Sequence, residues 1–152
     1  MLKSKRSAPN FNSSGSSTIS EEETTLFQSR FEISQESISP ESNLLNRSFN
    51  RLLLEAIDEE LSLLGVSVKQ TIYAYLEREF KISRKDIPGK VEDFADALEK
   101  LFGFGAKLVE IRIMEKLYRK VGDFKYFPEN GDIVFSEYVA ALREHYVKRM
   151  LT

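Results

Sequence analysis

The chain has 152 residues, of which 41% are hydrophobic and 30% are charged, and its formal net charge at pH 7 is −2. This length suits one soluble globular domain, and the absence of Cys excludes disulfides, thiolate nucleophiles and Cys-ligated zinc. No apolar run reaches the roughly 18 to 20 residues of a membrane span, and polar residues follow the basic start where a secretory signal would be apolar, so we expect a cytoplasmic protein.

Residues 1–46 form a low-complexity segment that contains fifteen Ser or Thr. Such a composition cannot bury enough apolar surface to offset the entropy of ordering the chain, so we predict a disordered tail over 1–46 and a helical domain over 47–152. Phe27 and Phe31 lie close to the acidic run Glu21–Glu23. They leave two interpretations open, a plain linker or a short docking segment that orders on a partner.

Charge divides unevenly between these two parts. The tail carries 4 basic and 6 acidic residues, and the remainder carries 18 of each. A formally neutral domain has no general electrostatic attraction to nucleic acid.

A first helix is predicted from about Ser48 to Leu64. Apolar residues recur there with helical spacing, and Gly65 is well placed to end the helix. The stripe consists of Phe49, Leu53, Ile57, Leu61 and Leu64. Four acidic residues, Glu55, Asp58, Glu59 and Glu60, alternate with the stripe, and we expect them to form a solvated face.

The second helix is predicted from Ser67 to about Phe80. Ser67 and Gln70 fit a capping box, in which each side chain binds the free backbone NH of the other residue. The connection that follows contains Pro88, which disfavours helix at the residue before it. We expect Ile82 and Ile87 to hold this connection against the core.

Two further helices are predicted at 90–102 and 106–121. They flank the sequence Gly103-Phe104-Gly105, which we interpret as a sharp corner where glycine supplies unusual backbone angles. The later helix is apolar around most of its circumference. Such a helix is either central in the bundle or lies in an interface between molecules.

A fifth helix is predicted from about Ser136 to the end of the chain. Before it, Asn130-Gly131 lies between β-prone residues, which is a signal for a short β-hairpin. The predicted fold class is therefore all-α, a compact bundle of about five helices, with a short hairpin before the last helix as a minor feature.

No constellation of residues typical of catalysis is evident. His145 is the single His, and a catalytic or metal-binding His needs positioned partners. The acidic clusters at 55–60 and 92–99 lack the Glu-x-x-His spacing of a metal site in a bundle. We therefore expect no enzyme activity, cofactor, metal site or small-molecule substrate.

Basic residues could gather into one patch if the 84–90 connection packs near the end of the helix at 106–121. The candidates are Arg84, Lys85, Lys116, Arg119, Lys120 and Lys125. With a hairpin before the last helix, such a patch would be typical of a winged-helix transcriptional regulator. The neutral domain and the acidic third helix favour a protein partner or self-association over nucleic acid.

Several short sequences between Leu52 and Val121 are similar to those of a known family. They are Ala56-Ile57-Asp58-Glu59, Ser67-Val68-Lys69-Gln70, Ile72-Tyr73, Phe94-Ala95, Ala97-Leu98-Glu99, Phe102-Gly103 and Gly105-Ala106-Lys107-Leu108. This region resembles the Nitrosopumilus-type output domain, a small helical domain of archaeal signalling proteins. The resemblance implies a signal-output role without any set of functional residues. Together these observations predict a non-enzymatic interaction or signal-output module, with a nucleic-acid-binding regulator as the alternative.

Overall fold

The computed structural model describes residues 39–128 and 130–152. Residues Glu41–Thr152 form one compact unit. The other unit, Met1–Pro40, lies almost wholly outside the described residues, and so does most of the tail that the sequence predicts. The all-α fold class is confirmed, because the described residues contain helices and no strand.

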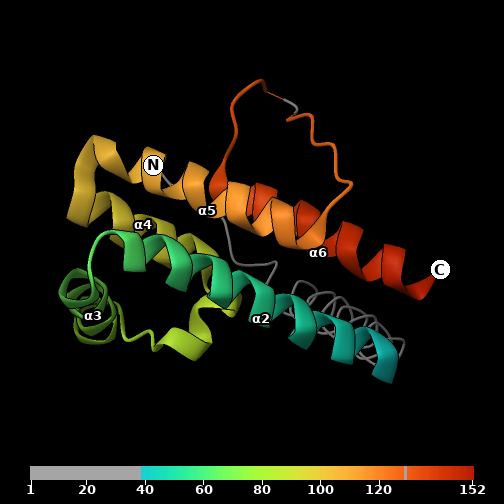
Figure 1. Ribbon diagram of the computed structural model, residues 1–152, viewed down its shortest axis with the longest axis horizontal. Coiled ribbons are helices and arrows are strands. Elements are labelled where there is room, and N and C mark those ends of the chain that lie inside the picture. Colours follow the sequence, from blue (N-terminus) through green and yellow to red (C-terminus); the bar gives the residue numbers. More distant parts are fainter. Residues whose placement is uncertain (1–38, 129) are drawn as a thin grey trace, which may run out of the picture. The chain divides into compact units, whose positions relative to one another are not determined.

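The described residues contain five α-helices, which follow one another in the order α2, α3, α4, α5 and α6 (Figure 1). Their bounds are Pro40–Leu63, Val66–Tyr75, Val91–Phe102, Ala106–Val121 and Phe135–Leu151. A π-helical turn, η2 (Leu76–Phe80), extends α3, and a 3-10 segment, η3 (Arg84–Gly89), leads toward α4. A short 3-10 turn, η4 (Gly103–Gly105), joins α4 to α5.

Helix α2 begins at Pro40, eight residues before the predicted start near Ser48. Proline is tolerated in the first turn, where its missing NH has no partner to lose, and Glu41 suits the positive end of the helix. Leu45 packs on the core, and Arg143 of α6 donates a hydrogen bond to Asn46 at 3.3 Å. These tertiary contacts stabilise a polar stretch that the sequence assigned to the tail.

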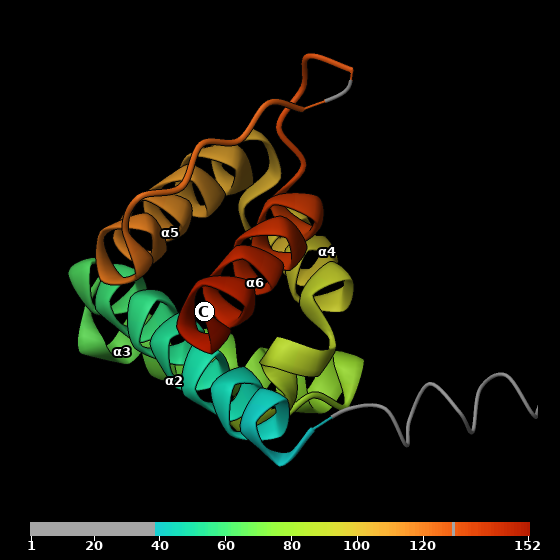
Figure 2. The ribbon, with the colours of Figure 1, turned by 90° about the vertical axis from the view of Figure 1, so that its right-hand side faces the viewer.

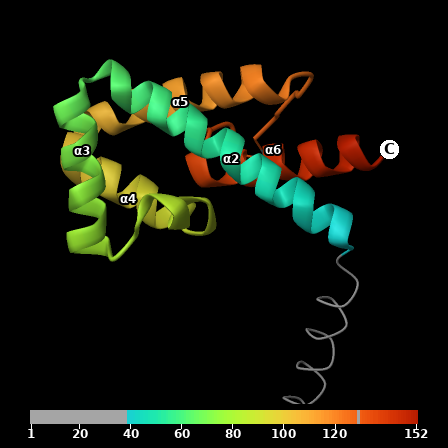
Figure 3. The same ribbon diagram turned by 60° about the horizontal axis from the view of Figure 1, so that its bottom comes forward.

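Helix α2 runs obliquely across α5 and α6 (Figure 3). Four residues of its predicted stripe, Phe49, Leu53, Ile57 and Leu61, are buried in the core, whereas Leu64 lies beyond the end of the helix and is exposed. The ring centroid of Phe49 lies 5.8 Å from that of Tyr146 in α6. The largest fully buried side chains come from α2, α4, α5 and α6, from the turns η2 and η3, and from the short link between these two turns. They are Phe49, Leu53, Ile57, Leu61, Leu76, Ile82, Ile87, Phe94, Leu98, Ile113, Leu117 and Phe135. Ile82 and Ile87 therefore hold the connection before α4 against the core, as predicted.

The predicted capping box at the start of α3 is wrong. The helix begins one residue earlier, after Gly65 at φ 119°, and no side chain caps it. Ser67 consequently lies inside the first turn, where its carbonyl accepts a hydrogen bond from the Thr71 hydroxyl at 2.9 Å. A glycine can adopt this backbone angle at little cost, so the chain turns here without a capping side chain.

The predicted hairpin between α5 and α6 is absent from the described residues of that segment, which arches away from the helices (Figure 2). A hairpin turn would place Asn130 and Gly131 at its two central positions. Here the Gly131 amide instead donates to the Pro128 carbonyl at 3.4 Å, so the glycine ends the turn. Phe124 and Tyr126 pack against Tyr138 of α6 rather than across a strand pair.

Only the first glycine of the Gly103-Phe104-Gly105 corner needs its special conformation. Gly103 has φ 58° and ψ −127°, a combination that residues with a Cβ rarely adopt. Gly105 has φ −68°, which any residue adopts, and an added Cβ there would make an ordinary 3.7 Å contact with Phe102.

We therefore expect opposite results from two matched substitutions. Gly103→Ala should lower the free energy of unfolding by about 1–3 kcal/mol because of backbone strain. Gly105→Ala should be neutral or should stabilise by up to about 1 kcal/mol, because it restricts the unfolded chain. Urea unfolding followed by circular dichroism measures both values, and equal effects of the two changes would contradict this assignment.

Candidate functional site

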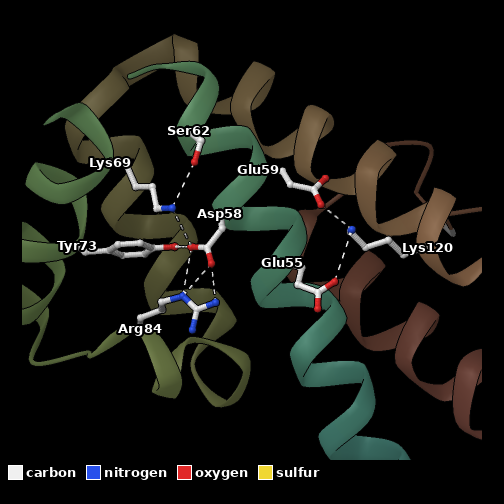
Figure 4. Close-up of polar contacts among 8 residues, drawn as sticks. All are labelled: Glu55, Asp58, Glu59, Ser62, Lys69, Tyr73, Arg84 and Lys120. Atoms are coloured by element: carbon white, nitrogen blue, oxygen red, sulfur yellow. Dashed lines mark hydrogen bonds and ion pairs between the residues drawn. The ribbon is translucent and has the colours of Figure 1, made fainter. Parts of the chain in front are cut away.

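The carboxylates of α2 point to two sides of the helix (Figure 4). Asp58 faces Tyr73 of α3 and Arg84 of η3, whereas Glu55 and Glu59 face Lys120 of α5. The prediction of a solvated acidic face is right for Glu55 and Glu59, which are exposed, and wrong for Glu60, which is buried; Asp58 is half-buried. All four form ion pairs with residues distant in sequence.

Asp58 accepts hydrogen bonds from two neighbouring elements. The Tyr73 hydroxyl donates to its Oδ1 at 2.5 Å, and Arg84 Nε donates to its Oδ2 at 3.0 Å. The Lys69 ammonium lies 3.9 Å away. Burial by itself would raise the pKa of Asp58, but the hydrogen bonds and the positive charges outweigh it and hold this pKa below its usual value.

Glu60 is the most buried acid of α2, with 2% of its surface exposed. It joins α2 to α5 because Lys116 Nζ lies 2.9 Å from one carboxylate oxygen and Arg112 Nε 3.1 Å from the other. Lys120 adds a more exposed contact, 2.7 Å from Glu59. A buried carboxylate with two cationic donors is satisfied, whereas removal of one donor would leave a costly uncompensated charge.

These ion pairs decide the outcome for the predicted basic patch. Arg84, Lys116 and Lys120 are each held by α2 carboxylates, and Arg84 and Lys120 lie on opposite sides of α2 (Figure 4). Lys85, Arg119 and Lys125 are exposed, and none of the ion pairs in the described part of the chain includes them. The six residues therefore do not form one continuous patch.

A groove of about 700 Å³ lies between α4, η4 and α5 and carries mostly negative charge. Its lining includes Glu92, Asp96 and Glu99 of α4, together with Lys107 and Glu110 of α5. The three α4 acids are exposed, as expected, and within 39–128 and 130–152 they form no ion pair. We call this feature the acidic groove.

Glu110 is the buried carboxylate of the acidic groove, with 6% of its surface exposed. Its ion pair is with Lys107, whose Nζ lies 3.5 Å away and whose side chain remains 68% exposed. Burial raises the pKa of Glu110, and the charge of Glu99 adds to this effect, while Lys107 opposes it. The negative charge of Glu110 is therefore less closely balanced by cations than the negative charge of Glu60.

An apolar strip borders the groove along η4 and α5. It consists of Phe104, which is fully exposed, Leu108, which is 58% exposed, and Ile111, which is 45% exposed. Beside it, a hollow of about 520 Å³ is lined by Ile111, Ile133 and other residues, and it shares Lys107 and Val134 with the acidic groove. The α5 apolar strip and the acidic groove are therefore adjacent parts of one surface.

His145 lies at the edge of an aromatic cluster, away from any acid–base partner seen here. Its ring centroid is 5.0 Å from that of Phe124, and Phe124 also contacts Tyr126 and Tyr138. Its Nε2 atom is buried, and no hydrogen bond reaches it from the described residues. His145 is therefore half-buried and packs on an aromatic side chain.

Metal-binding clusters and membrane-spanning helices are both absent from residues 39–128 and 130–152. No three His, Asp or Glu side chains there converge on a point where they could hold a metal ion. None of the helices described combines the length and apolar character needed to cross a membrane.

The sequence did not identify the residues that distinguish this surface. Phe104 was interpreted as part of a corner, and Glu110 was not singled out. The available signal was the position of Glu110 between Val109 and Ile111, a carboxylate within a helix that is apolar around most of its circumference. A charged residue at such a position is buried or borders a surface that is shielded from water.

No family model, no curated protein and no solved structure matches this chain. The resemblance of Leu52–Val121 to an archaeal output domain therefore stays a prediction.

We expect the Asp58 network to contribute stability that depends on pH. The Asp58→Asn change should lower the free energy of unfolding at pH 7 by about 1–3 kcal/mol, because it weakens hydrogen bonds to a charged group. The pKa of Asp58 is lower in the folded state, so this contribution is present above about pH 4 and is lost as the pH falls through the folded pKa.

Urea unfolding at pH 7 and at pH 3 measures the free energy of unfolding of the native protein and of the variant. The difference between the two proteins should be smaller at pH 3 than at pH 7. The exposed Asp132→Asn change serves as the control and should have little effect at either pH. A deficit for Asp58→Asn that is equally large at both values would contradict the role given to the charged carboxylate.

Proposed function

We propose that this domain is a non-enzymatic protein-interaction module and that its partner packs on the α5 apolar strip. The observation that carries this proposal is the exposure of Phe104, Leu108 and Ile111 along η4 and α5, next to the acidic groove. Contiguous exposed apolar residues beside polar ones are typical of protein-binding surfaces. Leu108 and Ile111 are three residues apart on α5 and therefore lie on the same face of that helix.

The charges of the domain support a protein partner more than nucleic acid. Non-specific binding to DNA depends on free Lys and Arg side chains that neutralise phosphates. Three of the six candidate cations are held by carboxylates of α2, and the groove beside the strip is acidic. The family resemblance of Leu52–Val121 adds the proposal that the interaction serves archaeal signal transduction.

A double substitution on the strip tests the interaction. Leu108→Ser with Ile111→Ser should weaken partner binding by at least about tenfold, because each buried aliphatic side chain contributes about 1.5–3 kcal/mol. Both side chains are exposed in the free domain, so the midpoint of thermal unfolding should change little. The measurement is cross-linked capture of the partner from native cell extract, quantified by mass spectrometry.

Leu44→Ser with Leu151→Ser is the matched control, because these residues are similarly exposed but lie on α2 and α6. This control should capture the partner as the native protein does. Sedimentation velocity on the purified chain distinguishes self-association from binding to another protein. If the native chain is a dimer and the strip substitutions dissociate it, the partner is a second copy of the chain. Equal capture by both double variants would contradict the proposal.

A further inference from the structure

The acidic groove holds more negative charge than its own cation can balance. Glu92, Asp96 and Glu99 enter it from α4, and Glu110 enters from α5, whereas Lys107 is the single basic residue in its lining. On α2, by contrast, the single carboxylate of Glu60 is paired with two cations, Arg112 and Lys116. The groove is thus the place where the described domain carries unpaired carboxylates around a buried one.

The arrangement of these carboxylates favours an organic cation over a metal ion. Metal ions need several ligands at about 2.0–2.6 Å from one point, and within the described residues no such convergence of three side chains exists. A guanidinium or ammonium on a long side chain can instead contact carboxylates that lie apart, and its aliphatic stem packs on apolar surface. Phe104 and Val134 provide such surface in the same lining.

We propose that the acidic groove receives a Lys or Arg side chain of the partner protein, while the adjacent α5 apolar strip binds the apolar residues next to it. This inference rests on the proposed interaction function and specifies the chemistry of the partner, an apolar segment with basic residues. The groove and the hollow beside the strip share Lys107 and Val134, so one segment can reach both.

Glu110 gives the groove its selectivity for positive charge. Because it is nearly inaccessible to water, a cation that reaches it interacts through a medium of lower dielectric constant than water. The contact of Glu110 with Lys107, at 3.5 Å, is longer than the two contacts that Glu60 makes, and the Lys107 side chain is mostly in solvent. An acidic side chain entering the same place would meet Glu99 and Glu110 and would be repelled.

Two synthetic peptides of 16 residues test this selectivity on the full chain. They share Leu and Ile at helical spacing and differ in four positions, which are Arg in one peptide and Glu in the other. In NMR titrations of the ¹⁵N-labelled protein, the Arg peptide should shift the amide signals of Phe104, Lys107 and Glu110. It should bind at least about tenfold more tightly than the Glu peptide, and more weakly at 0.5 M salt, because complementary charge favours the right partner and salt screens it.

Substitutions on the exposed face of α4 test the residues. Asp96→Asn with Glu99→Gln should weaken the Arg peptide about five- to tenfold, because two attractive charges are removed. The control is Glu77→Gln with Glu144→Gln, which makes the same change in net charge at exposed residues of η2 and α6. The control should change the affinity less than about twofold. Circular dichroism verifies that both double variants fold.

Three results would overturn the inference: equal binding of the two peptides, no binding of either peptide at 1 mM, or equal effects of the two double variants. Capture of the natural partner shows whether only the groove proposal is wrong or whether the proposed interaction function is wrong as well. If the Leu108→Ser and Ile111→Ser changes abolish capture but the Asp96→Asn and Glu99→Gln changes do not, the apolar strip binds the partner and the groove plays no part. If none of these changes affects capture, both proposals are wrong.

Discussion

The pairing of α2 carboxylates with cations from other elements is the constraint that shapes this domain. Glu60 is buried between α2 and α5 and needs both Arg112 and Lys116, so the two helices are tied together by charge as well as by apolar packing. Asp58 joins the same helix to α3 and η3. A buried carboxylate is tolerated only with such partners, so the polar contacts restrict how the helices can pack.

This pairing also decides which charges remain available at the surface. Arg84, Lys116 and Lys120 neutralise acids of the same chain, so their positive charge is balanced within the domain. Within the described residues Glu92, Asp96 and Glu99 of α4 form no ion pair, and they line the acidic groove around Glu110. A domain that is neutral in composition thus presents an acidic groove beside an apolar strip, a combination suited to a partner with apolar and basic residues.

The sequence predicts the helices well and the polar contacts poorly, for physical reasons. Ala106–Val121 was predicted with its observed bounds, since Gly105 and Gly122 flank a strong apolar period. The start of α2 was missed because its polar residues are held by contacts with α6 that no local pattern encodes. The ion pairs of Glu60 join residues more than fifty positions apart, and the burial of Glu110 depends on how α4 packs beside α5. Periodicity shows which face of a helix is apolar, but not which acids lie between two helices.

The most direct test of this charge arrangement is a fluorescence anisotropy titration of a 20-base-pair DNA duplex with the native full-length chain at 50 mM salt. With Arg84, Lys116 and Lys120 held by α2, we expect no saturable binding up to about 50 µM, a range in which basic domains bind DNA non-specifically at low salt. Saturable binding that weakens with salt and disappears in the Lys120→Glu variant, whose fold circular dichroism verifies, would show that this cation is free for a polyanion, and it would contradict this account of how the charges of the domain are paired.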